Sequence, residues 1–327
     1  MVFFKMKFIL SNLLCGFKRC PFEHTRYMKK NPKGEIMIVS VYVDDLIFTG
    51  DDEEMLSDFK SAMMNEFEMT DLGELHHFLG INVQKSKEGI FISQEKYTVE
   101  LLEKFNMKNS NPVSTPCVTG LKLSKNGEGK LVDQTLFRSL AGNLMYLTAT
   151  RPDIMYAVSL ISRFMEKPYS SHWEAAKRIL RYINGTIDYG IFYKTRVPVQ
   201  LVGYTDTDFG GSIDDSRSTL GYAFSLGSGI ISWCSKKQPV VALSTTEAEY
   251  IASSLTGLLH GKTKHICLRF HFLRELVSEG EINLEYCRSE EQVADNFTKP
   301  LGGLTFSRNV TSLGVQKIFG LGKAMLE

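Results

Sequence analysis

Hydrophobic residues recur along this chain with two different periods, and the first 70 residues show both. An apolar run over 36–43 and a shorter one over 46–49 are rich in β-branched and aromatic residues, which predicts the two strands of a β-hairpin. Asp51 or Asp52 then stands where a helix N-cap belongs, ahead of a helical pattern that ends near residue 67. The side chains expected on the buried face of this helix are Met55, Phe59, Met63 and Phe67.

The same two periods continue downstream. Strand patterns at 78–83 and 90–92 flank a short turn sequence, and a helical pattern covers 94–105. Residues 109–130 contain two prolines, three glycines and several Ser and Thr, so we interpret this stretch as a linker. Helices are then expected over 133–148, 153–165 and 171–184, short strands at 191–193, 200–205, 219–225 and 230–234, and a helix from about 245. The pattern as a whole predicts an α+β fold.

Composition narrows the class of protein. A length of 327 residues predicts about two domains, and 43% hydrophobic with 23% charged residues argues against disorder. The net charge of +1 means that any nucleic-acid binding has to come from local patches. The six cysteines show no Cys-x-x-Cys spacing and indicate reduced intracellular thiols. We expect neither a signal peptide nor a membrane span, because lysines interrupt the apolar start and no apolar run approaches about 20 residues.

Two adjacent acids, Asp44 and Asp45, fall at the tip of the first hairpin, within Tyr42-Val43-Asp44-Asp45. Desolvating two like charges is costly unless a cation neutralises them. Two hard oxygen ligands on a rigid hairpin are what a magnesium site for phosphoryl transfer needs. The alternative is an ordinary solvated turn, but the apolar strands on both sides favour the metal site.

A second candidate site is the basic side of the helix expected over 171–184. Its residues Lys177, Arg178 and Arg181 stand close in sequence to Trp173 and Tyr182. Basic residues interleaved with aromatic ones can follow a phosphate backbone and stack on bases. A solvated helix face explains the same pattern equally well, so both interpretations stay open.

Short motifs in a fixed order run along almost the whole chain. In the first part they are Tyr42–Asp45, Asp71–Leu75 with Phe78–Ile81, and Pro112–Pro116. Those further downstream are Arg138–Leu140, Tyr146–Asp153, Ala175–Tyr182, Ser235–Gln238, Ser244–Tyr250 and Phe297–Leu301. Each motif is moderately specific and the ordered set is highly specific. The set resembles the reverse transcriptase and RNase H region of copia-type retrotransposon polyproteins.

This resemblance implies a partial reverse transcriptase palm over 1–118, a helical thumb or connection segment over 119–186, and an RNase H-like domain over 187–327. The activities it implies are RNA-directed DNA synthesis and cleavage of the RNA strand of RNA–DNA hybrids. The implied cofactor is Mg²⁺, and the implied partners are an RNA template and an RNA–DNA hybrid. The residues carried over as catalytic are Asp44, Asp45, Asp206, Glu247 and Asp295, of which Asp44, Asp206, Glu247 and Asp295 would bind the metal.

The chain departs from the family pattern ahead of the hairpin. The polymerase site of the family also needs an Asp on an earlier strand. Before Asp44 the chain offers only Glu23 and Glu35, and neither stands in a fitting context. We therefore expect no polymerase activity from these 327 residues alone.

A second departure lies within the RNase H-like part. No Asp or Glu occurs between Glu249 and Glu275, so the family's third ligand, with its strand and helix, looks deleted near 257–260. A missing strand would leave an unpaired sheet edge. We expect a fragment without RNase H activity; the alternatives are a non-catalytic nucleic-acid-binding remnant and a relic with no molecular role.

Overall fold

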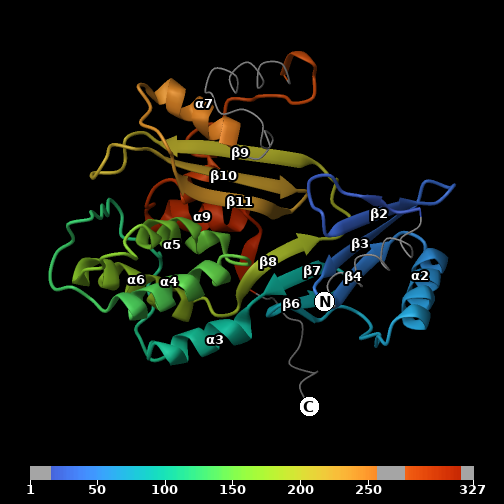
Figure 1. Ribbon diagram of the computed structural model, residues 1–327. Coiled ribbons are helices and arrows are strands. Elements are labelled where there is room, and N and C mark those ends of the chain that lie inside the picture. Colours follow the sequence, from blue (N-terminus) through green and yellow to red (C-terminus); the bar gives the residue numbers. More distant parts are fainter. Residues whose placement is uncertain (1–15, 256–276, 318–327) are drawn as a thin grey trace. The chain divides into compact units, whose positions relative to one another are not determined.

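Figure 1 shows the fold in a computed structural model, which describes residues 16–255 and 277–317. The chain divides into two compact units, Met1–Leu75 and His76–Glu327. Helices and antiparallel strands occur in both, which confirms the α+β class. Within the described ranges, no helix combines the length and apolar character that crossing a membrane requires.

The first unit contains an antiparallel sheet and one helix. Its strands lie in the order β1-β2-β3-β4, with α2 after the last of them. The bounds are Lys18–Arg19 for β1, Arg26–Lys30 for β2, Ile36–Tyr42 for β3, Asp45–Gly50 for β4 and Glu53–Glu66 for α2. The expected hairpin is confirmed, because β3 and β4 pair along their length and Tyr42 lies opposite Asp45 across a two-residue turn.

Helix α2 begins where the sequence places its cap. The Asp52 side chain accepts a hydrogen bond from the backbone N–H of Glu54 at 3.0 Å, which satisfies one of the free donors at the helix start. The expected apolar face is also confirmed, and it packs on the sheet. The buried side chains of this cluster are Met37, Val39, Met55, Phe59 and Met63. Each buried side chain of this size contributes roughly 1.5–3 kcal/mol.

The second unit contains a five-stranded sheet in the order β12-β8-β7-β6-β5. The bounds are His77–Phe78 for β5, Ile81–Lys85 for β6, Gly89–Ser93 for β7, Tyr189–Lys194 for β8 and Val315–Lys317 for β12. Strands β7 and β8 pair antiparallel, with Phe91 opposite Phe192, although the linker and all the central helices lie between them in sequence. In sequence, the boundaries expected near 118 and 186 fall between these paired strands, and the division into three domains stays a prediction.

The helices between β7 and β8 lie where their patterns predict them. They are α3 (Glu95–Lys104), α4 (Gln134–Leu147), α5 (Met155–Ser162) and α6 (Ser170–Asn184), with the short 3-10 helix η1 (Pro152–Ile154) ahead of α5. Residues 109–130 form no helix or strand, as expected of a linker. Fully buried side chains that join these helices into one core include Phe137, Leu140, Leu144, Ile154 and Ile183.

A buried ion pair fixes the start of α5 to the end of α6. Arg151 donates from Nε to Asp153 Oδ1 at 2.9 Å and from Nη2 to Asp153 Oδ2 at 2.7 Å. Its Nη1 donates to the carbonyl oxygen of Thr186 at 2.7 Å, and the Tyr182 hydroxyl donates to Asp153 Oδ2 at 2.7 Å. Both charged side chains are almost completely buried, at 1% and 0% exposure. Buried charges persist only when they are paired in this way.

A three-stranded antiparallel sheet follows, in the order β11-β10-β9. The bounds are Leu201–Asp208 for β9, Thr219–Leu226 for β10 and Gly229–Lys237 for β11, followed by α7 (Thr245–Leu255), the 3-10 helix η2 (Val293–Phe297) and α9 (Gly303–Ser312). Helices α7 and η2 both pack against β9. Within the part of the chain that the structure describes, β9 is an edge strand. The expected deletion near 257–260 lies outside the described residues.

Candidate functional site

The hairpin tip presents its two acids to solvent. Asp44 and Asp45 are exposed, and Val43, the first turn residue, has a φ of 50°. A positive φ is rare for a β-branched residue, so the turn holds Val43 in a strained conformation. Glu35 precedes the opposite end of β3 and accepts from Asn31 Nδ2 at 2.6 Å. Glu23 accepts from the Thr25 hydroxyl at 2.6 Å. Only Glu35 lies at the end of β3 away from the tip, because the Thr25 carbonyl oxygen accepts from the Val41 backbone N–H at 2.8 Å and so places the loop of Glu23 beside the tip end of that strand.

The second group of expected site residues gathers around a lysine. Asp206 lies near the end of β9 and Asp295 lies in η2. Lys299 Nζ lies 2.9 Å from Asp295 Oδ1 and 3.8 Å from Asp206 Oδ2. The Thr298 hydroxyl also donates a hydrogen bond to Asp206 Oδ2. The packing of η2 against β9 thus brings together two of the acids that the motifs suggested.

Glu249, on α7, belongs to the same electrostatic group. Burial raises the pKa of its carboxyl to about 7, and the negative charge of Asp206 adds to the rise. Burial likewise raises the pKa of Asp295 to about 6; the hydrogen bond from Lys299 opposes this rise and the charge of Asp206 strengthens it. Burial also raises the pKa of Asp208, the last residue of β9. Crowded, partly desolvated carboxyls of this kind often mark functional sites.

Glu247 does not join this group. Its carboxylate accepts from the backbone N–H of Leu243 at 2.6 Å, and its own N–H donates to Ser244 Oγ at 3.1 Å. Both contacts are those of a residue that caps the start of α7. The expected convergence of Asp206, Glu247 and Asp295 is therefore not seen. The sequence alone could have indicated this role of Glu247, because Ser244-Thr245-Thr246-Glu247 is a capping-box pattern.

The donor chemistry of the group suits a hard divalent cation such as Mg²⁺. Asp206, Glu249 and Asp295 offer carboxylate oxygens, the ligands that Mg²⁺ prefers. Burial is the main cause of the raised pKa values of Glu249 and Asp295, the charge of Asp206 adds to both, and a bound cation would favour the ionised form of each carboxyl. Lys299 supplies positive charge to two of the three carboxylates. In the described ranges, no three acidic, His or Cys side chains are grouped tightly enough to hold a metal. The residues therefore fit the ion by chemistry, and binding would require Lys299 to withdraw.

Two of the three basic residues of α6 are held against the linker. Arg178 Nη2 donates to Thr115 Oγ1 at 3.0 Å, and Arg181 Nε donates to the carbonyl oxygen of Asn111 at 2.7 Å. Lys177 is exposed and extends over the Trp173 ring, 5.7 Å from its centroid. Only Lys177 therefore stands free enough to meet a phosphate backbone without breaking a contact to the linker.

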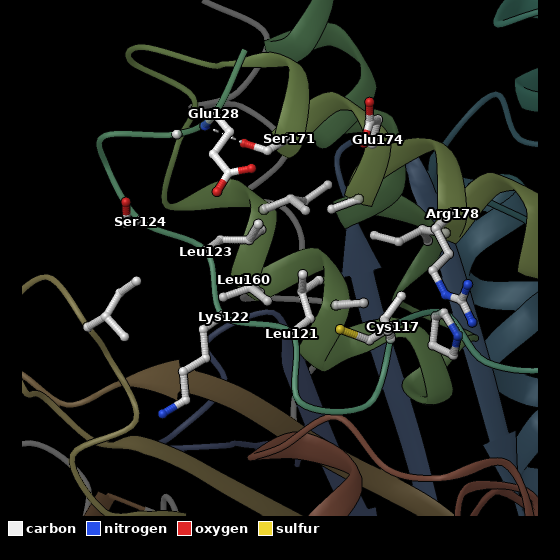
Figure 2. Close-up of a pocket in the computed structure, with 18 of the residues that line it drawn as sticks. Cys117, Leu121, Lys122, Leu123, Ser124, Glu128, Leu160, Ser171, Glu174 and Arg178 are labelled. Atoms are coloured by element: carbon white, nitrogen blue, oxygen red, sulfur yellow. Dashed lines mark hydrogen bonds between the residues drawn. The ribbon is translucent and has the colours of Figure 1, made fainter.

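A cavity of about 530 Å³ lies between the linker and helices α5 and α6 (Figure 2). Leu121, Leu123 and Leu160 give it an apolar lining, and Cys117 and Arg178 lie side by side at one end. Burial raises the pKa of the Cys117 thiol to about 11, so the sulfur stays protonated at neutral pH. Because the thiolate is the reactive form, the cavity contains no ready cysteine nucleophile.

Comparison with known proteins identifies the relatives of the chain. Residues 3–119 match the family described as reverse transcriptase (RNA-dependent DNA polymerase). The chain is 38% identical over 320 residues to the retrovirus-related Pol polyprotein from transposon RE2 of Arabidopsis thaliana, covering 86% of this chain and 22% of that protein. It is 37% identical over 318 residues to the corresponding polyprotein from transposon TNT 1-94 of Nicotiana tabacum, covering 84% of this chain and 24% of that protein. No solved structure matches it significantly.

Two further features of these alignments matter. The RE2 alignment runs over 320 residues but covers 86% of 327, about 281 residues, which leaves about 39 aligned positions without a residue of this chain. A third relative, the uncharacterized mitochondrial protein AtMg00810 of Arabidopsis thaliana, is 39% identical over 221 residues, 68% of this chain and 92% of that protein. This chain therefore belongs to the reverse transcriptase family of retrotransposon Pol polyproteins and spans about a fifth of the RE2 polyprotein.

Proposed function

We propose that the chain is a reverse transcriptase fragment joined to an RNase H-like domain, and that neither catalytic centre is complete. The observation that carries the proposal is the meeting of Asp206 and Asp295 at Lys299, with Glu249 in the same electrostatic group. The family's RNase H ligands follow the same order along the chain: Asp206 on the edge strand β9, Glu249 on helix α7 and Asp295 in η2. Glu249 takes the ligand position that the motif order predicts for Glu247.

In a complete centre of this class, bound Mg²⁺ ions orient a water and stabilise charge on the leaving oxygen. The residues present here would hold the metal through Asp206, Glu249 and Asp295, while Lys299 balances their charge until the substrate arrives. With three carboxylates in place of four, the site would bind a cation weakly and position the scissile phosphate poorly. The domain would then retain binding and lose cleavage.

Three observations support a lost strand. Strand β9 is an edge strand within the described ranges, about 39 positions of the RE2 polyprotein have no counterpart, and no acid stands between Glu249 and Glu275. For the polymerase half, Asp44 and Asp45 stand exposed at their hairpin tip, with Glu23 and Glu35 directed to other partners. The partners of the fragment would be an RNA template or an RNA–DNA hybrid, bound without chemistry.

The test begins with activity. Purified 327-residue protein is incubated with a primed RNA template and dNTPs, and separately with an RNA–DNA hybrid, in Mg²⁺ and in Mn²⁺. We expect neither extension nor cleavage above background. Removing electrostatic stabilisation in a transition state costs several kcal/mol, and each 1.36 kcal/mol is about tenfold in rate. Hybrid cleavage that disappears in Asp206→Asn would refute the loss of function.

The assignment of Glu249 rather than Glu247 as a ligand is tested by comparing the Mn²⁺ binding of two matched variants. Mn²⁺ binding, followed by electron paramagnetic resonance, should be weak in the wild type and fall further in Asp206→Asn and Glu249→Gln. Glu247→Gln changes the same side chain two residues away and should bind Mn²⁺ like the wild type. The opposite result, with Glu247→Gln impaired and Glu249→Gln unaffected, would return the ligand role to Glu247.

A further inference from the structure

A second, smaller cavity of about 140 Å³ lies in the same unit, next to the acid group. The linker, helix α5, the sheet and the segment after η2 all contribute to its wall. Five cationic side chains line it, against two acidic ones: Lys122, Lys125, Arg163, Lys237 and Lys299. So many like charges in a small volume repel one another, and a bound anion would reduce this repulsion.

Two of the five cations are paired with carboxylates, and the backbone of a third is anchored. Lys299 is held by Asp295, and Lys237 forms an ion pair with Asp215 at 2.6 Å. Lys125 comes from the linker, whose backbone N–H at this residue donates to both carboxylate oxygens of Asp214 at 3.0 Å. This contact anchors the linker against the cavity and so fixes the position of the lysines it carries.

Arg163 is different, because its charge is partly desolvated and unpaired. It donates from Nη2 to the neutral Thr219 hydroxyl at 3.1 Å, and among the residues described no carboxylate forms an ion pair with it. Burial lowers its pKa, a sign that the protein does not fully replace the lost hydration. A guanidinium suits a ligand that is planar or tetrahedral and negatively charged, because its donors can bind two ligand oxygens at once.

Lys122 completes the arrangement from the linker side. It is exposed, and in Figure 2 its side chain extends away from the apolar lining of the larger cavity, toward the ribbon of the β9–β11 sheet. Its charge acts on Asp208 at the end of β9, and no hydrogen bond or ion pair holds its amine among the described residues. Lys122 and Arg163 therefore approach one small volume from two different elements.

We propose that this cavity binds one phosphate group of a nucleic-acid backbone, with Arg163 and Lys122 as its donors. A cavity of about 140 Å³ has room for a phosphate group. Lys299 lines the cavity and also contacts Asp295, which puts the phosphate beside the acid group. The inference rests on the proposed RNase H-like function only for the identity of the strand that supplies the phosphate. It assigns a binding role to the stretch over 109–130, which the sequence predicts to be a linker.

The test measures binding without metal, so that it does not depend on cleavage. The full chain is titrated with a fluorescently labelled RNA–DNA hybrid in EDTA at several salt concentrations. Lys122→Gln and Arg163→Gln should each weaken binding about fivefold and reduce the slope of log Kobs against log salt by about 1, as expected for one lost phosphate contact. Lys130→Gln is the matched control: it is an exposed linker lysine outside the cavity, and the substitution removes the same charge.

A charge-conserving variant and a second ligand complete the experiment. Arg163→Lys retains the charge and should recover most of the affinity, which separates phosphate binding from a folding defect; thermal melting of each variant checks the fold. Inorganic phosphate, titrated alone, distinguishes the source of the ligand. The proposal is overturned if Lys122→Gln and Lys130→Gln bind the hybrid identically. It is also overturned if only free phosphate binding, and not hybrid binding, responds to Arg163→Gln. Loss of hybrid binding in these variants supports the proposal even where no cleavage is found.

Discussion

Lys299 Nζ lies 2.9 Å from Oδ1 of Asp295, the residue four positions before it in the chain. The contact gives a buried carboxylate a cation from its own chain, at a spacing that places the two side chains on one side of a helical turn. The pKa of Asp295 is nevertheless raised to about 6, because burial outweighs the lysine. The acid group is therefore destabilising when fully ionised, and this has a measurable consequence.

We expect the stability of the second unit to fall as pH rises from about 4 to 7. The carboxyls of Glu249 and Asp295 have ordinary pKa values of 4.5 and 3.8 and folded values of about 7 and about 6. Between these limits the folded chain holds more protons than the unfolded chain, so the free energy of unfolding decreases with pH. Thermal melting at pH 5 and 7.5 should show a smaller loss in Glu249→Gln than in the wild type, with Glu247→Gln unchanged. An equal loss in all three proteins would contradict the assignment of Glu249 to the acid group.

The buried pair of Arg151 and Asp153 should be essential to the fold. Arg151→Met leaves the Asp153 carboxylate buried without its partner, and we expect a loss of about 3–5 kcal/mol in the free energy of unfolding, measured in urea. Tyr182→Phe removes one hydrogen bond to the same carboxylate and should cost about 1.5–3 kcal/mol. The double variant Arg151→Met/Asp153→Leu should lose less than the sum of the single changes. Strict additivity would show that the two charges do not depend on each other.

The strained turn at Val43 predicts a stabilising substitution. Val43→Gly removes the side chain that opposes a φ of 50°, and relief of strain should exceed the added entropy of the unfolded chain. We expect the first unit to gain about 1 kcal/mol in free energy of unfolding. The control is Val41→Gly, which lies within β3 and should destabilise. A destabilised Val43→Gly would mean that the valine side chain makes contacts that outweigh its strain.

The hydrogen bond from Arg181 to the linker is expected to protect the linker from proteolysis. Arg181→Gln loses the charged donor to the carbonyl oxygen of Asn111 and should make the linker easier to cleave with trypsin at Lys122 or Lys125. Lys177→Gln, on the same helix, should leave the digestion rate unchanged because the Lys177 amine lies over the Trp173 ring and, among the described residues, forms no hydrogen bond or ion pair with the linker. If both variants digest alike, Arg181 does not hold the linker.

Local patterns predicted most of the secondary structure. The hairpin around Asp44 and the apolar face of α2 followed from periodicity, because each pattern is long and regular. Strand β2 was missed since Arg26–Lys30 is half polar, and it is a strand because β3 pairs with it. Helix η2 was missed because five residues carry no periodic signal.

The candidate site was predicted less completely. Motif order singled out Asp206 and Asp295, while the choice between Glu247 and Glu249 depended on which carboxylate the helix cap uses. The roles of Lys299 and Arg163 arise from contacts between elements far apart in sequence, and no local pattern contains that information.

The pairing of β7 with β8 limits how this chain can be shortened or recombined. A product that began after residue 118 would carry β8 without the neighbour that covers one side of it, exposing a row of backbone N–H and C=O groups. Such an open edge recruits strands from other copies and favours aggregation. A chain that keeps the acid group without the strand at Gly89–Ser93 is therefore expected to aggregate more readily than the whole chain.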